Sequence, residues 1–224
     1  MKKIVILFCV ILSFLFSCTT DYQIPSYADN TIRVAAVGDS ITYGYSIRNR
    51  DVNSYPAQLK KKLGTRWSVG NFGMNGATLL KKGNRPYWET EKLSNISEFQ
   101  PSVIVINLGA NDSKSMNWQF RDQFVPDYIE LITFFRQLKS NPQIFICYPV
   151  PAYPGRFGIR DHIIKNEIIP LINQVAEETG IKVIDLYKAL SYKKELFPDT
   201  VHPNAEGAEL IAETIFLYIT DESL

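Results

Sequence analysis

Short apolar runs alternate with amphipathic stretches along most of this chain. Runs typical of buried strands occur at 32–38, 67–71, 103–109, 143–148 and 182–187. Apolar residues at helical spacing occur at 54–64, 89–99, 121–139, 161–179 and 204–219. Alternating elements with apolar strands predict a parallel sheet that is covered by helices on both faces. In such a sheet, ligand chemistry is expected at the carboxyl ends of the strands.

The alternation runs to the end of the chain without a Pro/Gly-rich or charged linker, so one domain is expected. Pro170 interrupts one helical stretch. Because proline lacks the N–H that a helix interior needs, that helix is expected to kink or to start afresh there.

The first residues have a different pattern. Lys2 and Lys3 precede an apolar run at 4–16 that is too short to span a bilayer but has the length of a signal-peptide core. The run ends in Leu-Phe-Ser-Cys at 15–18, which resembles the lipobox of bacterial lipoproteins. The resemblance implies a signal peptide at 1–17, a lipid anchor on Cys18, a tether at 18–30 and a domain at 31–222. The protein would then be exported and membrane-anchored in the bacterial envelope; a buried N-terminal strand or helix is the alternative.

Composition narrows the possible functions. The 224 residues are 46% hydrophobic and 21% charged, with a formal net charge of +1. The chain therefore lacks the excess of basic residues that is typical of proteins that bind nucleic acid. Three cysteines are too few for a disulfide scaffold. Cys147 lies in an apolar run and is expected to be a buried core thiol.

Small and polar residues gather in four blocks, three of which follow predicted strands. Each block alone is typical of a turn. Their position at strand ends, however, favours a common site at one edge of the sheet. The blocks are Gly38-Asp39-Ser40, the stretch 71–76, Gly109-Ala110-Asn111-Asp112, and Asp199-Thr200-Val201-His202.

Histidine is scarce, which limits any Ser-His mechanism to two candidates, His162 and His202. His162 begins a helical stretch, where a capping or surface role is favoured. His202 follows Asp199 by three residues. At that spacing the aspartate can accept a hydrogen bond from one ring nitrogen and leave the other facing a serine.

Taken in order, the four blocks resemble the SGNH or GDSL hydrolases over nearly the whole chain after the leader. The resemblance implies a flavodoxin-like three-layer α/β/α sandwich with a five-stranded parallel sheet. It places the nucleophile on Ser40, the base on His202 and its partner on Asp199. The oxyanion hole would comprise Ser40, Gly76 and Asn111, with Gly73 as the alternative glycine. No metal or organic cofactor is implied.

The later half, 163–190 and 196–215, resembles the branch of carbohydrate acetylesterases that includes sialate- and xylan-type members. This implies a serine esterase that acts on a small-molecule or glycan ester. A lysophospholipase or thioesterase of the same family and a non-catalytic glycan-binding lipoprotein are alternatives. The sequence does not indicate the oligomeric state. Eight aromatic residues are candidates either for stacking on a sugar or for packing the core: Tyr43, Tyr45, Tyr87, Trp88, Trp118, Tyr148, Tyr153 and Phe157.

Overall fold

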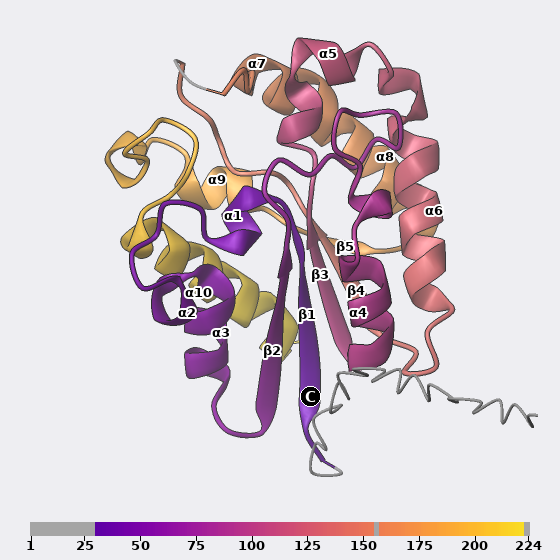
Figure 1. Ribbon diagram of the computed structural model, residues 1–224, viewed down its shortest axis with the longest axis vertical. Coiled ribbons are helices and arrows are strands. Elements are labelled where there is room, and N and C mark those ends of the chain that lie inside the picture. The colour runs from indigo at the N-terminus through magenta and orange to yellow at the C-terminus, as the bar shows by residue number, and fades with distance from the viewer. Residues whose placement is uncertain (1–29, 155–156, 222–224) are drawn as a thin grey trace, which may run out of the picture.

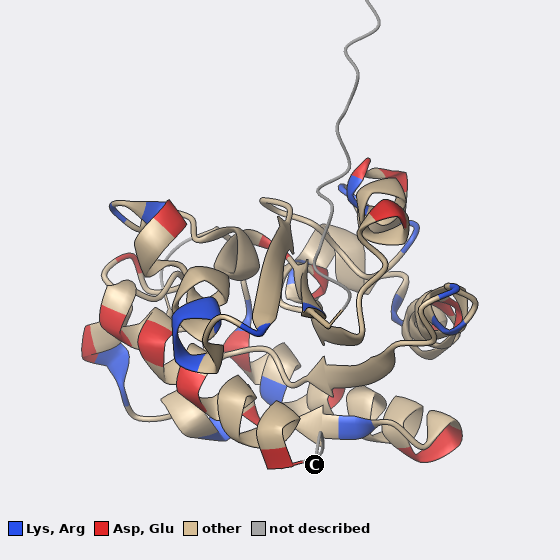
Figure 2. Cartoon of the chain, turned by 90° about the horizontal axis from the view of Figure 1, so that it is seen from below, with Lys and Arg blue, Asp and Glu red and all other residues tan. Residues whose placement is uncertain are grey.

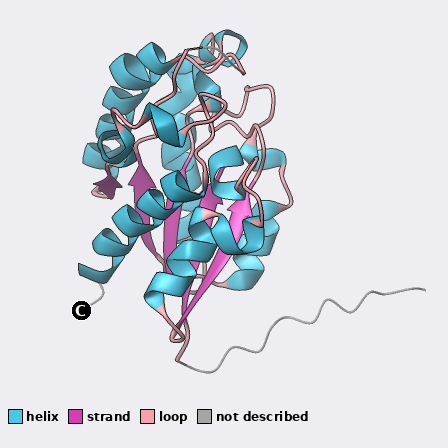
Figure 3. Cartoon of the chain, turned by 90° about the vertical axis from the view of Figure 1, so that its left-hand side faces the viewer, coloured by secondary structure: helices cyan, strands magenta, loops and turns pink. Residues whose placement is uncertain are grey.

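Five parallel strands form the central sheet (Figure 1). This computed structural model describes residues 30–154 and 157–221. The strand order is β2-β1-β3-β4-β5, and the arrows in Figure 3 point the same way. This order confirms the predicted flavodoxin-like sheet. The strands are β1 (Ile32–Gly38), β2 (Trp67–Gly73), β3 (Val103–Asn107), β4 (Gln143–Cys147) and β5 (Lys182–Ile184).

Residues 1–29 lie outside the described part of the chain. They contain the predicted signal segment, Cys18 and nearly all of the predicted tether, so export and the lipid anchor stay predictions. Across 30–154 and 157–221, no helix has both the length and the apolar character needed to cross a membrane.

The strands alternate their side chains between two hydrophobic cores, one on each face of the sheet. On β1, Ala35 and Val37 belong to one core and Val34 and Ala36 to the other. The same two-residue period continues through β3 and β4. Cys147 lies in the second core with no exposed surface, which confirms the expected core thiol. Burial raises its pKa above the usual value.

Helices cover both faces, as the alternation of elements predicts. On one side of the sheet in Figure 1 lie α4 (Lys92–Phe99), α6 (Phe124–Arg136) and α8 (Ile169–Thr179). On the other lie α3 (Tyr55–Leu63), α9 (Leu186–Leu190) and α10 (Ala205–Asp221). Shorter helices lie in the connections: α1 (Ser40–Tyr43), α2 (Arg50–Asn53), α5 (Ser115–Trp118) and α7 (Asp161–Ile163).

Pro170 lies just after a π-helical turn. The predicted helix 161–179 is divided into α7, a π-helical turn at Ile164–Ile168, and α8, whose first turn holds Pro170. Ile163, Ile168 and Ile169 at the two junctions all have right-handed helical dihedral angles, so the helix does not start afresh; the interruption that Pro170 predicts takes the form of the π-helical turn before it.

β5 ends earlier than the predicted 182–187. The Asp185 side chain accepts a hydrogen bond from the Lys188 backbone N–H at 2.7 Å and so caps α9. An aspartate cap favours helix over continued strand, and the apolar residues after it belong to a helix.

Acidic and basic residue positions are interspersed along the helices, as the red and blue ribbon segments of Figure 2 show. Lys62 on α3 contacts Glu213 on α10 at 2.7 Å and so links two helices of the same face. Partly exposed pairs of this kind contribute about 1 kcal/mol or less. The two hydrophobic cores therefore contribute most of the stability.

Candidate active site

Ser40 lies immediately beyond β1, at the first residue of α1. Gly38 permits this tight turn, because a Cβ there would lie 2.1 Å from Thr42 Oγ1 and 2.7 Å from the Asn107 carbonyl oxygen. Asp39 caps α1 by accepting a hydrogen bond from the Ile41 N–H at 2.9 Å. The turn therefore fixes the Ser40 hydroxyl at the carboxyl edge of the sheet.

His202 meets Ser40 although 162 positions separate them in the chain. Its Nε2 lies 2.9 Å from Ser40 Oγ, and its Nδ1 lies 2.7 Å from Asp199 Oδ2. A carboxylate next to Nδ1 favours the neutral tautomer whose proton is on Nδ1. In that tautomer Nε2 carries a lone pair and accepts the hydrogen bond of the Ser40 hydroxyl.

Backbone groups hold Asp199 in place. Its Oδ1 accepts hydrogen bonds from the N–H groups of Val201 at 3.0 Å and His202 at 2.7 Å. Burial favours a higher pKa for Asp199, but hydrogen bonds from the backbone and ring of His202 and from the Val201 backbone hold its pKa below the usual value. Asp199 is therefore ionised at neutral pH.

Gly76 and Gly73 occupy different environments. Gly73 packs so closely on α1 that a Cβ would lie 2.1 Å from the Tyr43 nitrogen, and its own N–H donates to Asn71 Oδ1 at 3.0 Å. Gly76 lines the pocket in front of Ser40 at φ +76°, in the left-handed region. Among the described residues, the Gly76 N–H has no hydrogen-bond acceptor. Gly76 is therefore better placed to donate to a ligand.

Asn111 follows β3, begins a short 3-10 turn and lines the same pocket. Its Nδ2 lies 3.2 Å from Asp39 Oδ2 and 3.1 Å from the Ala77 carbonyl oxygen. Its backbone carbonyl accepts from Asn117 Nδ2 at 2.8 Å. These contacts orient the amide at the mouth of the sheet.

Two carboxyls at this edge of the sheet are buried: Asp39, which lines the pocket, and Asp112, which does not. Burial raises the pKa of Asp39 to about 7, although the backbone hydrogen bond from Ile41 opposes this shift. Burial likewise raises the pKa of Asp112 to about 6, against hydrogen bonds from the Leu80 and Leu79 backbone. Both groups therefore bind protons more tightly in the folded chain than in water.

The raised pKa of Asp39 makes stability depend on pH. The unfolded chain releases this proton near 3.8 and the folded chain near 7. Between these values the folded state binds more protons, so one such carboxyl lowers the free energy of unfolding by about 1.4 kcal/mol per pH unit as pH rises. We expect Asp39→Asn to remove this contribution from about pH 4.5 to 6.5, as measured by urea denaturation. Asp51→Asn, at a side chain that is 90% exposed, serves as the control; equal slopes in wild type and Asp39→Asn would contradict the expectation.

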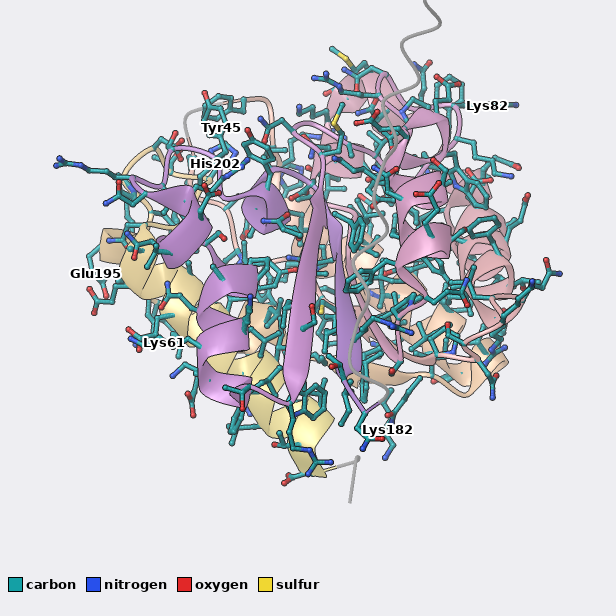
Figure 4. All side chains as sticks on the ribbon, turned by 60° about the horizontal axis from the view of Figure 1, so that its bottom comes forward. Tyr45, Lys61, Lys82, Lys182, Glu195 and His202 are labelled. Atoms are coloured by element: carbon teal, nitrogen blue, oxygen red, sulfur yellow. The ribbon has the colours of Figure 1, made fainter. Side chains whose placement is uncertain are left out.

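The pocket in front of Ser40 has a volume of about 180 Å³. Two aromatic rings stand beside its histidine: the Tyr45 and Phe157 centroids lie 4.5 Å and 5.0 Å from that of His202. Figure 4 shows Tyr45 and His202 next to each other, at the opposite end of the protein from Lys182. Among the eight aromatic candidates for sugar contact, only Tyr45 and Phe157 line this pocket, whereas Tyr87 and Trp118 are buried in the core.

Sequence reasoning missed two cationic side chains that line the pocket, Arg85 and Lys114. Burial lowers the pKa of Lys114, while the charges of Asp39 and Asp112 favour its charged form. Lys114 follows Asn111 by only three residues, so its place near the predicted site could have been inferred from the sequence. Arg85 follows no periodic pattern. His162 lines a different cavity, in agreement with its expected surface role.

A serine, a histidine and an aspartate joined by hydrogen bonds at the carboxyl edge of an α/β sheet are the arrangement of the serine-hydrolase class. Residues 36–210 match the GDSL-like lipase/acylhydrolase family, and the chain belongs to that family. It is 37% identical over 211 residues to an acetylxylan esterase of Xylanibacter ruminicola. The match covers 86% of this chain and 44% of that relative, so the chain spans less than half of the relative's length.

Solved structures share the fold. A protein from Agrobacterium tumefaciens, named a putative arylesterase, aligns with a TM-score of 0.73 at 22% identity, over 85% of this chain and 99% of its own. A carbohydrate acetylesterase from Sinorhizobium meliloti aligns with a TM-score of 0.71 at 15% identity, over 86% of this chain and 100% of its own. At these identities the likeness shows the fold alone.

Proposed function

We propose that this protein is a serine esterase that removes small acyl groups, above all O-acetyl groups, from carbohydrates. The observation that carries the proposal is the hydrogen-bond chain from Ser40 Oγ through the His202 ring to Asp199, at 2.9 and 2.7 Å. These distances suit a nucleophile, its general base and the group that orients the base.

The first half of the reaction forms an acyl-enzyme. Ser40 Oγ attacks the ester carbonyl carbon while His202 Nε2 takes the hydroxyl proton, and Asp199 stabilises the resulting imidazolium. The tetrahedral intermediate then collapses. Its C–O bond to the alcohol breaks, and the leaving oxygen takes the proton from His202.

Negative charge on the former carbonyl oxygen needs donors. Ser40, Gly76 and Asn111 line the pocket in which this charge develops, which supports the N–H groups of Ser40 and Gly76 and the amide of Asn111 as the proposed donors. Because Asn111 Nδ2 already faces two acceptors, an oxyanion has to replace or share one of them; a full negative charge makes it the stronger acceptor than the Ala77 carbonyl. Removing one donor of this kind costs about 3 to 4 kcal/mol of transition-state stabilisation.

Water completes the cycle. With the alcohol gone, His202 Nε2 takes a proton from a water molecule that attacks the acyl carbon, and the carboxylic acid leaves as the Ser40 hydroxyl is restored. The proton returns to Ser40 through His202, so the enzyme ends in its starting state.

Two observations support a small acyl group on a sugar. A pocket of about 180 Å³ is smaller than the roughly 300 Å³ at which ordinary ligand pockets begin. It favours a short acyl group over a fatty-acyl chain. The similarity to an acetylxylan esterase supports acetyl on carbohydrate.

The expected acyl-chain preference tests the proposal. We expect kcat/KM to fall from acetyl to butyryl to octanoyl esters of 4-nitrophenol, because the pocket has little room for longer chains. We also expect acetate release from acetylated xylan, measured by an enzymatic acetate assay. A preference for octanoyl esters would favour a lysophospholipase or thioesterase, and no turnover of any ester would favour a binding protein; either would overturn the proposal.

A further inference from the structure

A second cavity, of about 570 Å³, opens beside the pocket of Ser40. Its walls come from the segments that follow β4 and β5. We call it the tyrosine groove, after the side chains of Tyr153, Tyr187 and Tyr192 that line it. Ile159 lines both the tyrosine groove and the pocket of Ser40, so the two cavities are neighbours.

The three tyrosines differ in their contacts and exposure. Tyr187 is fixed because its hydroxyl donates to Asp161 Oδ2 at 2.9 Å. The Tyr153 ring packs edge-on against Phe197, with centroids 5.3 Å apart. Tyr192 is 99% exposed. A phenol ring combines a flat apolar face with a polar tip, which suits contact with a sugar ring.

Tyr192 also has a costly backbone conformation, with φ at 64° in the left-handed region. A bulky side chain rarely adopts this conformation, and such residues cluster at ligand-binding positions. Since its ring is almost fully exposed, burial in the folded chain does not account for its presence there.

The groove is also lined by residues of α7 and of the π-helical turn. His162, on α7, and Lys165, within Ile164–Ile168, both line the groove and are exposed. Single π-turns within helices occur frequently at functional sites. These two side chains add hydrogen-bonding groups to the tyrosine-lined groove, which suits the hydroxyls of a sugar.

The groove is connected to the loop of Asp199 and His202. The Tyr153 N–H donates to the Thr200 carbonyl oxygen at 2.7 Å, between those two residues in sequence. The groove volume lies within the usual range for ligand pockets, about 300 to 1,000 Å³, whereas the pocket of Ser40 lies below it. A chain of sugars with its ester at Ser40 therefore has its natural continuation in the groove.

We propose that the tyrosine groove binds the sugar units next to the acetylated one, so that the enzyme prefers esters on an oligosaccharide chain to esters on a single sugar. This inference rests on the proposed esterase function. Tyr192 is the specificity-determining residue: its ring stacks on a neighbouring sugar and takes no part in the chemistry.

Three substrates distinguish sugar binding in the groove from ester hydrolysis at Ser40: acetylated xylotetraose, acetylated methyl xyloside and 4-nitrophenyl acetate. We expect Tyr192→Ala to lower kcat/KM about tenfold for the tetraose and to leave the other two within about twofold. Tyr192→Phe keeps the ring and is expected to remain near wild type. Tyr218→Ala is the matched control, because Tyr218 is an exposed tyrosine on α10 that does not line the groove.

Binding provides a readout that needs no turnover. We expect calorimetric titration of unacetylated xylotetraose to show binding to Ser40→Ala and weaker binding to the double variant with Tyr192→Ala. Equal binding to both variants, or equal tetraose kinetics in Tyr192→Ala and Tyr218→Ala, would overturn the proposed sugar binding by the groove. If the wild type is active in that case, the proposed esterase function still stands. Failure of the wild type to hydrolyse any of the three substrates would instead overturn the proposed function.

Discussion

Ser40→Ala is expected to lower kcat/KM for 4-nitrophenyl acetate by about 10⁵- to 10⁶-fold. The substitution removes the attacking oxygen and leaves the neighbouring groups in place. Only the 2.9 Å contact with His202 Nε2 is lost, so the variant is expected to fold. Circular dichroism and the thermal midpoint check folding, and a fluorophosphonate probe checks for a reactive serine.

Ser94→Ala is the control for Ser40→Ala. Ser94 lies on α4 and its hydroxyl donates to the Glu91 carbonyl oxygen, away from the pocket. We expect this variant to retain wild-type rates and to react with the probe. Hydrolysis by folded Ser40→Ala above a hundredth of the wild-type rate, or probe attachment to it, would show that Ser40 is not the nucleophile.

The juxtaposition of Ser40 and His202 was predictable from sequence for a physical reason. Parallel strands present their carboxyl ends at one edge, so polar residues that follow different strands meet there. The apolar runs of the sequence are clear enough to show about where each strand ends. The contact between Asp199 and His202 was predictable from their spacing of three residues, and Asp199 Oδ2 lies 2.7 Å from His202 Nδ1.

Other features of the site depend on the path of irregular loops, which the hydrophobic periodicity of the sequence does not predict. Gly73 and Gly76 are indistinguishable in sequence, and their difference lies in backbone angle and clearance: one packs against α1 and the other faces the pocket. Arg85 reaches the pocket from a long connection between β2 and α4. Tyr192 is exposed by a left-handed turn that the sequence does not signal.

Asp199→Asn is expected to lower kcat by about 10⁴-fold while leaving the fold intact. The reason lies in the backbone contacts of Asp199, whose Oδ1 accepts from the N–H groups of Val201 and His202. An asparagine keeps both bonds only with its carbonyl oxygen in that position. Its NH₂ group then faces Nδ1 of His202 and donates to it, which forces the proton of the neutral ring onto Nε2. The lone pair that must take the Ser40 proton is lost, although every atom keeps its place.

The orientation of the polar group at position 199, and not only its presence, is therefore expected to set the rate. Asp185→Asn is the matched control: Asp185 caps α9 through the Lys188 N–H, a bond that asparagine retains, and we expect wild-type kcat. We expect the thermal midpoint of Asp199→Asn to lie near that of the control and KM to change little, because the pocket is unaltered. A kcat for Asp199→Asn within tenfold of wild type would mean that His202 selects its tautomer without Asp199, and the mechanism proposed for this site would fail.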